Sequence, residues 1–321
     1  MVAGKSRSKS FVAAFVSAAF AACQRGGPLP EVKLDGQPAA VRRMVTAGLE
    51  TAHAKSAEPG PSGQLGKLLL ANRLPEPALT AFERSRRLDP TSPVWPYYIG
   101  VVYQEGKDYP SARKAFENHL ALDPESFAAH VRLAEVLYAS GDKAGTLERF
   151  ATAISRRPKA PRALFGMGML LQSQGRNEEA GGFFERAVES FPRYRLARIA
   201  LAETWRARGN EAKAAETLYG YDASRERAQA QAAPFDDPLM AEVRRLDAGP
   251  FATRRQAQQL AREGKVAQAV KLIEGAVRDD PKSPAFRSDL MMYLRVPICE
   301  SWALMPPSWF LRFWTGQAGR G

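Results

Sequence analysis

The stretches "AFERSRRLDP" at residues 81–90 and "AFENHLALDP" at residues 115–124 share six of their ten letters and lie 34 residues apart. The same step carries a column of prolines: Pro90, Pro124, Pro158 and Pro192. Each proline stands where one helix would end before the next unit begins, because proline cannot continue a helix. A phrase repeated at a fixed step of this size predicts an array of stacked units, each packed on its neighbours.

Three further columns of residues keep the 34-residue step. Large residues recur at Phe82, Phe116, Phe150, Phe184 and Leu218. Small residues recur at Gly66, Gly100, Ala134, Gly168 and Ala202, and again at Ala78, Ala112, Thr146, Ala180 and Ala214. Small side chains allow two helices to approach closely, and the recurring phenylalanine fills the space between neighbours. Short turns such as "SGD" at 140–142 separate the paired helices, where glycine ends a helix in a left-handed conformation.

Helix-turn-helix units of 34 residues with these columns resemble the tetratricopeptide repeat (TPR) family. The resemblance implies an all-α fold, a right-handed TPR superhelix (α-solenoid) of stacked helix pairs. Five registered units cover residues 59–226, and a further helix is predicted before them at 38–58.

The repeat register is interrupted after Tyr221 and returns displaced by 21 residues. The interruption defines an insertion at 227–249, predicted to contain a short helix around 237–246 and to act as a lid or a hinge. A sixth repeat and the first helix of a partial seventh are predicted at 250–294.

The beginning of the chain has the pattern of an export signal. Lys5, Arg7 and Lys9 precede "FVAAFVSAAFAA" at 11–22, in which Ser17 is the one polar residue. Twelve residues are too few to span a bilayer as a helix, so a signal peptide at 1–22 is predicted. This predicts an exported protein, in the periplasm or anchored to the membrane of a bacterial cell envelope.

The end of this signal has two interpretations. Phe20-Ala21-Ala22-Cys23 resembles the lipobox of bacterial lipoproteins, which implies acylation of Cys23 and a membrane anchor followed by a flexible tether at 23–37. The stretch lacks the family's usual leucine three places before the cysteine. Ala19-Phe20-Ala21 instead suits ordinary signal peptidase.

The last 27 residues, 295–321, lack the small-residue columns and contain three of the five tryptophans. Two interpretations remain open for this Trp-rich tail. It is either an aromatic tail that docks on the protein or at a membrane interface, or the product of a shifted reading frame with no selected structure.

The TPR resemblance also implies where a partner binds. In that family the first helix of each repeat lines a concave groove, with its fifth and ninth places pointing inward. The groove implied here consists of Tyr97, Tyr98, Val101, Val131, Arg132, Glu135, Phe165 and Met169. Its mainly apolar lining favours an extended or helical peptide with apolar anchors, oriented by Arg132 and Glu135. The same residues could instead pack against the adjacent helix or against the insertion.

Composition and motifs argue against an enzyme and against a nucleic-acid partner. The net charge is +12, but the arginines are scattered along helices without interleaved aromatic residues, so no nucleic acid is expected. His53, His119 and His130 have no metal-binding spacing, and "GPSGQLGK" at 60–67 departs from a phosphate loop. We therefore predict no catalytic residue, no metal and no cofactor.

The predicted function is a protein-protein interaction scaffold of the cell envelope that binds a partner peptide or protein in the groove. Two alternatives remain: a non-catalytic accessory or regulatory subunit of an envelope enzyme or assembly machine, and a self-assembling structural solenoid.

Overall fold

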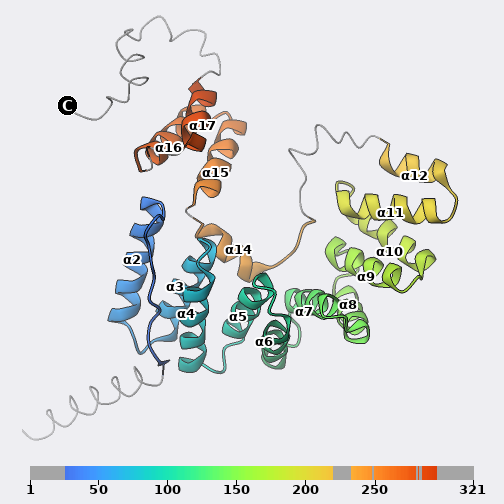
Figure 1. Ribbon diagram of the computed structural model, residues 1–321, viewed down its shortest axis with the longest axis horizontal. Helices are drawn as coiled ribbons and strands as arrows, with labels where there is room; N and C mark the ends of the chain where they lie inside the picture. Colours follow the sequence, from blue (N-terminus) through green and yellow to red (C-terminus); the bar gives the residue numbers. More distant parts are fainter. Residues whose placement is uncertain (1–25, 220–232, 248, 280, 282–283, 295–321) are drawn as a thin grey trace, which may run out of the picture. The chain divides into compact units, whose positions relative to one another are not determined.

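The computed structural model describes residues 26–219, 233–247, 249–279, 281 and 284–294 (Figure 1). The predicted signal peptide at 1–22, Cys23 and the Trp-rich tail at 295–321 lie outside these residues, as does most of the stretch that precedes the insertion helix. The described chain forms two compact units. Of the described residues, unit 1 comprises 26–33, 45–219 and 233–246, and unit 2 comprises 34–44, 247, 249–279, 281 and 284–294.

Unit 1 is built from helix pairs. They are α3 (Pro59–Ala71) with α4 (Pro75–Leu88), α5 (Val94–Glu105) with α6 (Tyr109–Leu122), α7 (Phe127–Ala139) with α8 (Lys143–Arg156), α9 (Pro161–Ser173) with α10 (Asn177–Ser190), and α11 (Arg195–Ala207) with α12 (Glu211–Leu218). Each pair packs on the next (Figure 1). Helix α2 (Ala39–Ala54) precedes them. All regular elements of the described residues are helices, as the predicted all-α solenoid requires.

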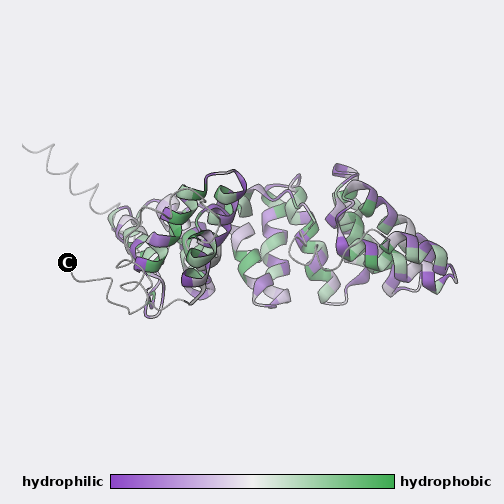
Figure 2. Ribbon diagram, turned by 90° about the horizontal axis from the view of Figure 1, so that it is seen from above, coloured by the Kyte–Doolittle hydropathy of each residue, from purple (hydrophilic) through white to green (hydrophobic). Residues whose placement is uncertain are grey.

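The recurring phenylalanines and glycines fit one another inside each pair. Phe82, Phe116 and Phe184 are fully buried. A Cβ atom added to Gly100 would lie only 2.7 Å from the ring of Phe116, and one added to Gly168 would lie 2.5 Å from the ring of Phe184. The two columns are therefore two sides of one contact. Figure 2 shows hydrophobic and hydrophilic residues side by side on the helices.

The turns inside the repeats share a left-handed residue. Gly141, Gly175 and Gly209 have φ angles of 83°, 77° and 73°. The first two repeats have Arg73 and Lys107 at the same place, with φ angles of 63° and 62°. A left-handed conformation is unfavourable for a residue with a Cβ atom, so these two turns store strain that the later repeats avoid.

We expect Lys107→Gly to stabilise the protein by about 0.5–1 kcal/mol, because relief of the left-handed strain outweighs the extra backbone entropy of glycine in the unfolded chain. Gly141→Ala, at the equivalent turn, is expected to destabilise it by a similar amount. Urea unfolding of both variants measures the effect, and a loss of stability in Lys107→Gly would contradict this account.

The insertion contributes α14 (Pro238–Arg245), which packs against α3 within unit 1 (Figure 1). Its position corresponds to the helix expected around 237–246. Asp237 caps it, because its Oδ1 accepts a hydrogen bond of 3.0 Å from the backbone N–H of Met240.

Unit 2 contains α15 (Pro250–Arg262), α16 (Val266–Asp279) and α17 (Pro284–Leu294). Its core is formed by Ala257, Ala269, Ile273, Phe286, Leu290 and Tyr293. The Nη2 atom of Arg254 donates a hydrogen bond of 2.9 Å to Asp289 and joins α15 to α17. In the described part of the chain, no helix has the length and apolar character needed to cross a membrane.

Candidate functional site

The eight predicted groove residues lie on α5, α7 and α9 of unit 1. Four of them are completely buried: Tyr97, Tyr98, Val101 and Val131. Arg132 retains 12% of its side-chain exposure. Glu135, Phe165 and Met169 are partly buried. The structure therefore separates the predicted groove into a covered part in the first three repeats and an open part further along.

The two tyrosines of the covered part are fixed by aromatic packing and by their hydroxyl groups. Tyr98 stacks on Phe82 with ring centroids 4.9 Å apart. Its hydroxyl donates a hydrogen bond of 3.0 Å to the carbonyl oxygen of Leu239 in the insertion. The Tyr97 hydroxyl accepts a bond of 2.8 Å from Nε of Arg132. Burial raises the pKa of both phenols, so both remain neutral.

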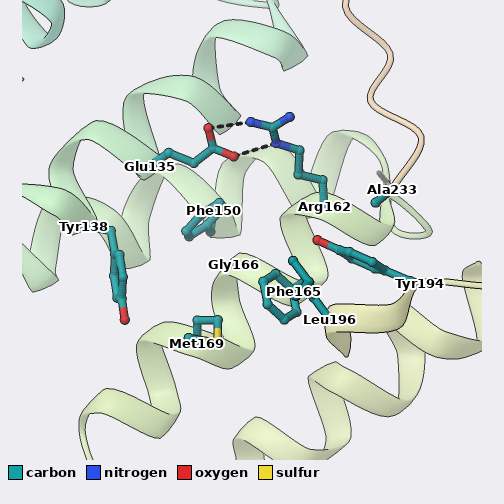
Figure 3. Close-up of a pocket in the computed structure, with 10 residues that line it drawn as sticks. All are labelled: Glu135, Tyr138, Phe150, Arg162, Phe165, Gly166, Met169, Tyr194, Leu196 and Ala233. Carbon is teal, nitrogen blue, oxygen red and sulfur yellow. Dashed lines mark hydrogen bonds and ion pairs between the residues drawn. The ribbon is translucent and has the colours of Figure 1, made fainter. Parts of the chain in front are cut away.

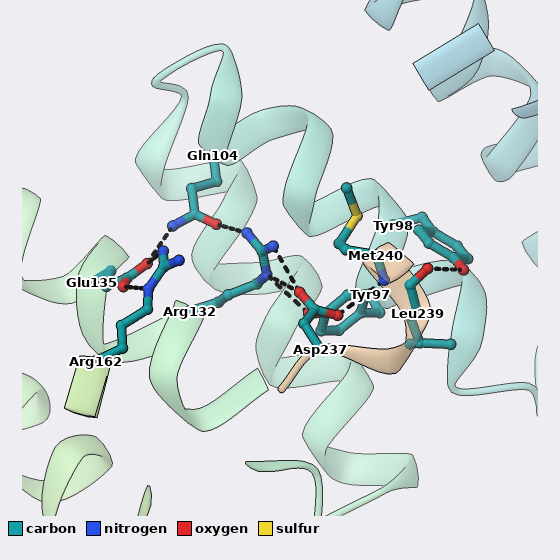
Figure 4. Close-up of polar contacts among 9 residues, drawn as sticks. All are labelled: Tyr97, Tyr98, Gln104, Arg132, Glu135, Arg162, Asp237, Leu239 and Met240. Carbon is teal, nitrogen blue, oxygen red and sulfur yellow. Dashed lines mark hydrogen bonds and ion pairs between the residues drawn. The ribbon is translucent and has the colours of Figure 1, made fainter. Parts of the chain in front are cut away.

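The insertion itself covers these residues. Residues 233–246 are called the docked segment from here on. Figure 4 shows the carboxylate of Asp237 lying against Arg132, whose Nη2 donates a hydrogen bond of 2.7 Å to Oδ2. The Asp237 side chain is fully buried. Burial lowers the pKa of Arg132, but Tyr97 and Asp237 beside it outweigh burial and hold that pKa above its ordinary value.

Further contacts fasten both ends of the docked segment. Two guanidinium groups lie over the ring of Phe235, with the Cζ atoms of Arg162 and Arg132 at 4.4 Å and 5.4 Å from the ring centroid. At the other end, Lys67 pairs with Glu242 at 2.7 Å. The Asn72 side chain donates a bond of 3.2 Å to the carbonyl oxygen of Leu246.

A series of hydrogen bonds between side chains links the covered part of the groove to its open part (Figure 4). Arg132 donates a bond of 2.9 Å to the side chain of Gln104, which donates one of 3.2 Å to Glu135. Glu135 in turn accepts bonds of 2.6 and 2.8 Å from Arg162. Three neighbouring repeats thus share one network of polar and charged side chains.

The open part is a pocket of about 410 Å³. It is lined by Glu135, Tyr138, Phe150, Arg162, Phe165, Gly166, Met169, Tyr194, Leu196 and Ala233 (Figure 3). The ion pair of Glu135 and Arg162 forms one wall, and Phe165, Met169 and Leu196 supply apolar surface. Leu196 is 55% exposed and Tyr138 is 38% exposed. Burial raises the pKa of Tyr194 to about 12.

The predicted groove included three of the ten pocket residues and missed the rest. Places 2 and 12 of a first helix lie on the same face as places 5 and 9, because residues three or four apart are neighbours on a helix. Arg162 and Leu196 occupy place 2, and Tyr138 occupies place 12. Helical periodicity could have identified these three. Ala233 belongs to the insertion, and no repeat pattern could have placed it there.

The pocket and the covered groove supply apolar surface, aromatic rings and paired charges. Among the described residues, no group of three or more histidine, cysteine, aspartate or glutamate side chains could hold a metal ion. The geometry suits the binding of a polypeptide segment through apolar anchors and charge pairing.

Comparison with known proteins agrees with this architecture. Two TPR family models match residues 103–164 and 147–194. A TPR repeat-containing protein of Methanocaldococcus jannaschii is 25% identical over 114 residues, which are 36% of this chain. The matched part spans about 20% of that relative's length.

Solved structures that are similar to this chain share less than 25% of its sequence, so the likeness is one of fold alone. A double mutant of MamA from Desulfovibrio magneticus RS-1 has a TM-score of 0.50 at 22% identity, covering 53% of this chain and 96% of that one. YrrB, described as a TPR protein with an unusual peptide-binding site, has a TM-score of 0.47 at 22% identity and covers 63% of this chain and 99% of that one.

Proposed function

We propose that this chain, whose residues 103–164 and 147–194 match tetratricopeptide repeat models, is a protein-interaction scaffold that binds a peptide segment of a partner protein in the pocket of its third to fifth repeats. The observation that carries the proposal is the pocket of about 410 Å³, whose exposed Leu196 and Tyr138 stand beside the paired Glu135 and Arg162. Burying one apolar anchor there would release water from apolar surface, and the ion pair would orient the peptide backbone or a polar side chain.

We propose that the protein acts at a bacterial cell envelope. It is supported by the sequence of the first 23 residues, with a basic start, twelve mostly apolar residues and Cys23. Acylation of Cys23 would anchor the repeats to a membrane. Cleavage before Cys23 removes Lys5, Arg7 and Lys9 and leaves 43 basic and 34 acidic residues, a net charge of +9 that would add attraction to an anionic lipid surface.

Leu196→Asp is expected to weaken peptide binding at least tenfold, because it places a charge where an apolar anchor would be buried. The measurement is selection of binders from a displayed peptide library with the full chain, followed by titration of the selected peptides. Leu147→Asp is the matched control, since Leu147 is 39% exposed on α8 and does not line the pocket. Equal affinity of the selected peptides for both variants would refute binding in the pocket.

A further inference from the structure

The docked segment is held by groups that together recognise a sequence pattern. An aromatic ring contacts two arginines, an aspartate two residues later pairs with Arg132, and a proline then starts a helix. A glutamate five residues after the aspartate pairs with Lys67. We propose that the groove of the first three repeats is a binding site for a partner helix of this pattern, aromatic-x-Asp-Pro with a following carboxylate, and that the docked segment occupies it as an intramolecular competitor.

Charge complementarity identifies the chemistry of that partner. The groove places two cations, Arg132 and Lys67, in largely buried positions. Their ion-pair partners are the carboxylates of Asp237 and Glu242, both from the docked segment. Any helix that covers the groove in place of the docked segment would bury these two cations again, beside two phenol rings. Burying a charge is costly unless it is paired, so the groove selects an acidic helix over a basic or a purely apolar one.

The docked segment has the properties of an exchangeable ligand. Its helix, α14, has eight residues, and a helix of this length is unstable in water without packing. Four of its fourteen residues are buried: Ala233, Asp237, Met240 and Val243. Six others are exposed: Pro234, Asp236, Pro238, Glu242, Arg244 and Arg245. The helix is therefore ordered by docking, and a partner with a larger apolar face and the same charges can replace it.

The position of the docked segment also couples this groove to the pocket. Ala233 lines the pocket, and Phe235 stacks on Arg162, which forms the pocket's ion pair with Glu135. A partner that extends from the pocket toward the second repeat must displace Phe235 first. The groove proposal itself rests on the contacts of the docked segment and stands whether or not a peptide binds in the pocket.

The test uses a labelled synthetic peptide of residues 233–246 and the full chain carrying Asp237→Ala, which removes the central carboxylate of the competitor. We expect the peptide to bind this variant at least tenfold more tightly than the wild-type chain, measured by fluorescence anisotropy. Asp236→Ala is the matched control, because Asp236 is exposed on the same segment and should leave the groove covered. The same peptide carrying Asp237→Ala should lose its affinity.

A second measurement needs no variant of the chain. Excess peptide added to the wild-type protein should accelerate amide hydrogen exchange at Met240 and Val243, while exchange in α9 and α10 stays slow. Equal affinity of the peptide for the wild-type chain and for its Asp237→Ala and Asp236→Ala variants would show that the segment is a permanent part of the fold. Unchanged exchange at Met240 and Val243 would show the same. If the wild-type chain dimerises and Arg132→Ala abolishes the dimer, the groove's partner is the segment of a second copy and a foreign partner is excluded.

Discussion

The Phe116→Ala variant is expected to lose about 3–5 kcal/mol of unfolding free energy, the usual cost of truncating a buried aromatic ring. Phe116 is fully buried in the second repeat and meets the backbone of Gly100 and the ring of Tyr97. The repeats stack in one dimension, so this loss weakens both neighbouring interfaces. Urea unfolding followed by circular dichroism measures it.

A double-mutant cycle distinguishes this contact from general loss of core. Gly100→Ala alone should cost about 1–3 kcal/mol, because the added Cβ would meet the Phe116 ring at 2.7 Å. Combined with Phe116→Ala it should cost much less, because the space is then empty. Leu122→Ala is the control on the same helix, since Leu122 is 45% exposed, and should stay within about 0.5 kcal/mol. Additive losses in the cycle would contradict the paired role of the two columns.

Arg132→Ala is expected to release the docked segment from the repeats. It would leave Asp237 fully buried without its cation, and breaking a buried ion pair from one side costs about 3–5 kcal/mol. An eight-residue helix with few buried side chains cannot absorb that loss and remain docked. The measurement is hydrogen exchange, in which Met240 and Val243 should lose protection while α9 and α10 keep theirs.

Arg157→Ala is the matched control for this result. Arg157 pairs with Asp236, the neighbour of Asp237 on the same segment, but the side chains are 44% and 64% exposed. An exposed pair contributes about 0–1 kcal/mol, so this variant should keep the segment protected. Retained protection in Arg132→Ala would mean that apolar contacts alone hold the segment in place.

The sequence by itself determined the repeat architecture, because each repeat of a periodic fold uses the same side-chain contacts. A phenylalanine that recurs opposite a small residue every 34 positions specifies the same helix crossing each time, as Phe116 with Gly100 and Phe184 with Gly168 show. The left-handed turns at Gly141 and Gly175 follow from the same columns. At the equivalent place in the second repeat, Lys107 adopts the conformation without the glycine that would indicate it.

Only the tertiary structure decided which part of the groove is accessible. The side chains at places 5 and 9 of the first helix of each repeat are predicted to point into the groove. Their places in the repeat do not reveal which segment of the chain packs against them. Tyr98 and Arg132 are hydrogen-bonded to the docked segment, whereas Phe165 and Met169 line an open pocket. The difference arises because Asp237, more than a hundred residues from Arg132 in sequence, is brought against it. A contact at that separation depends on where the insertion folds back, and no local periodicity encodes that position.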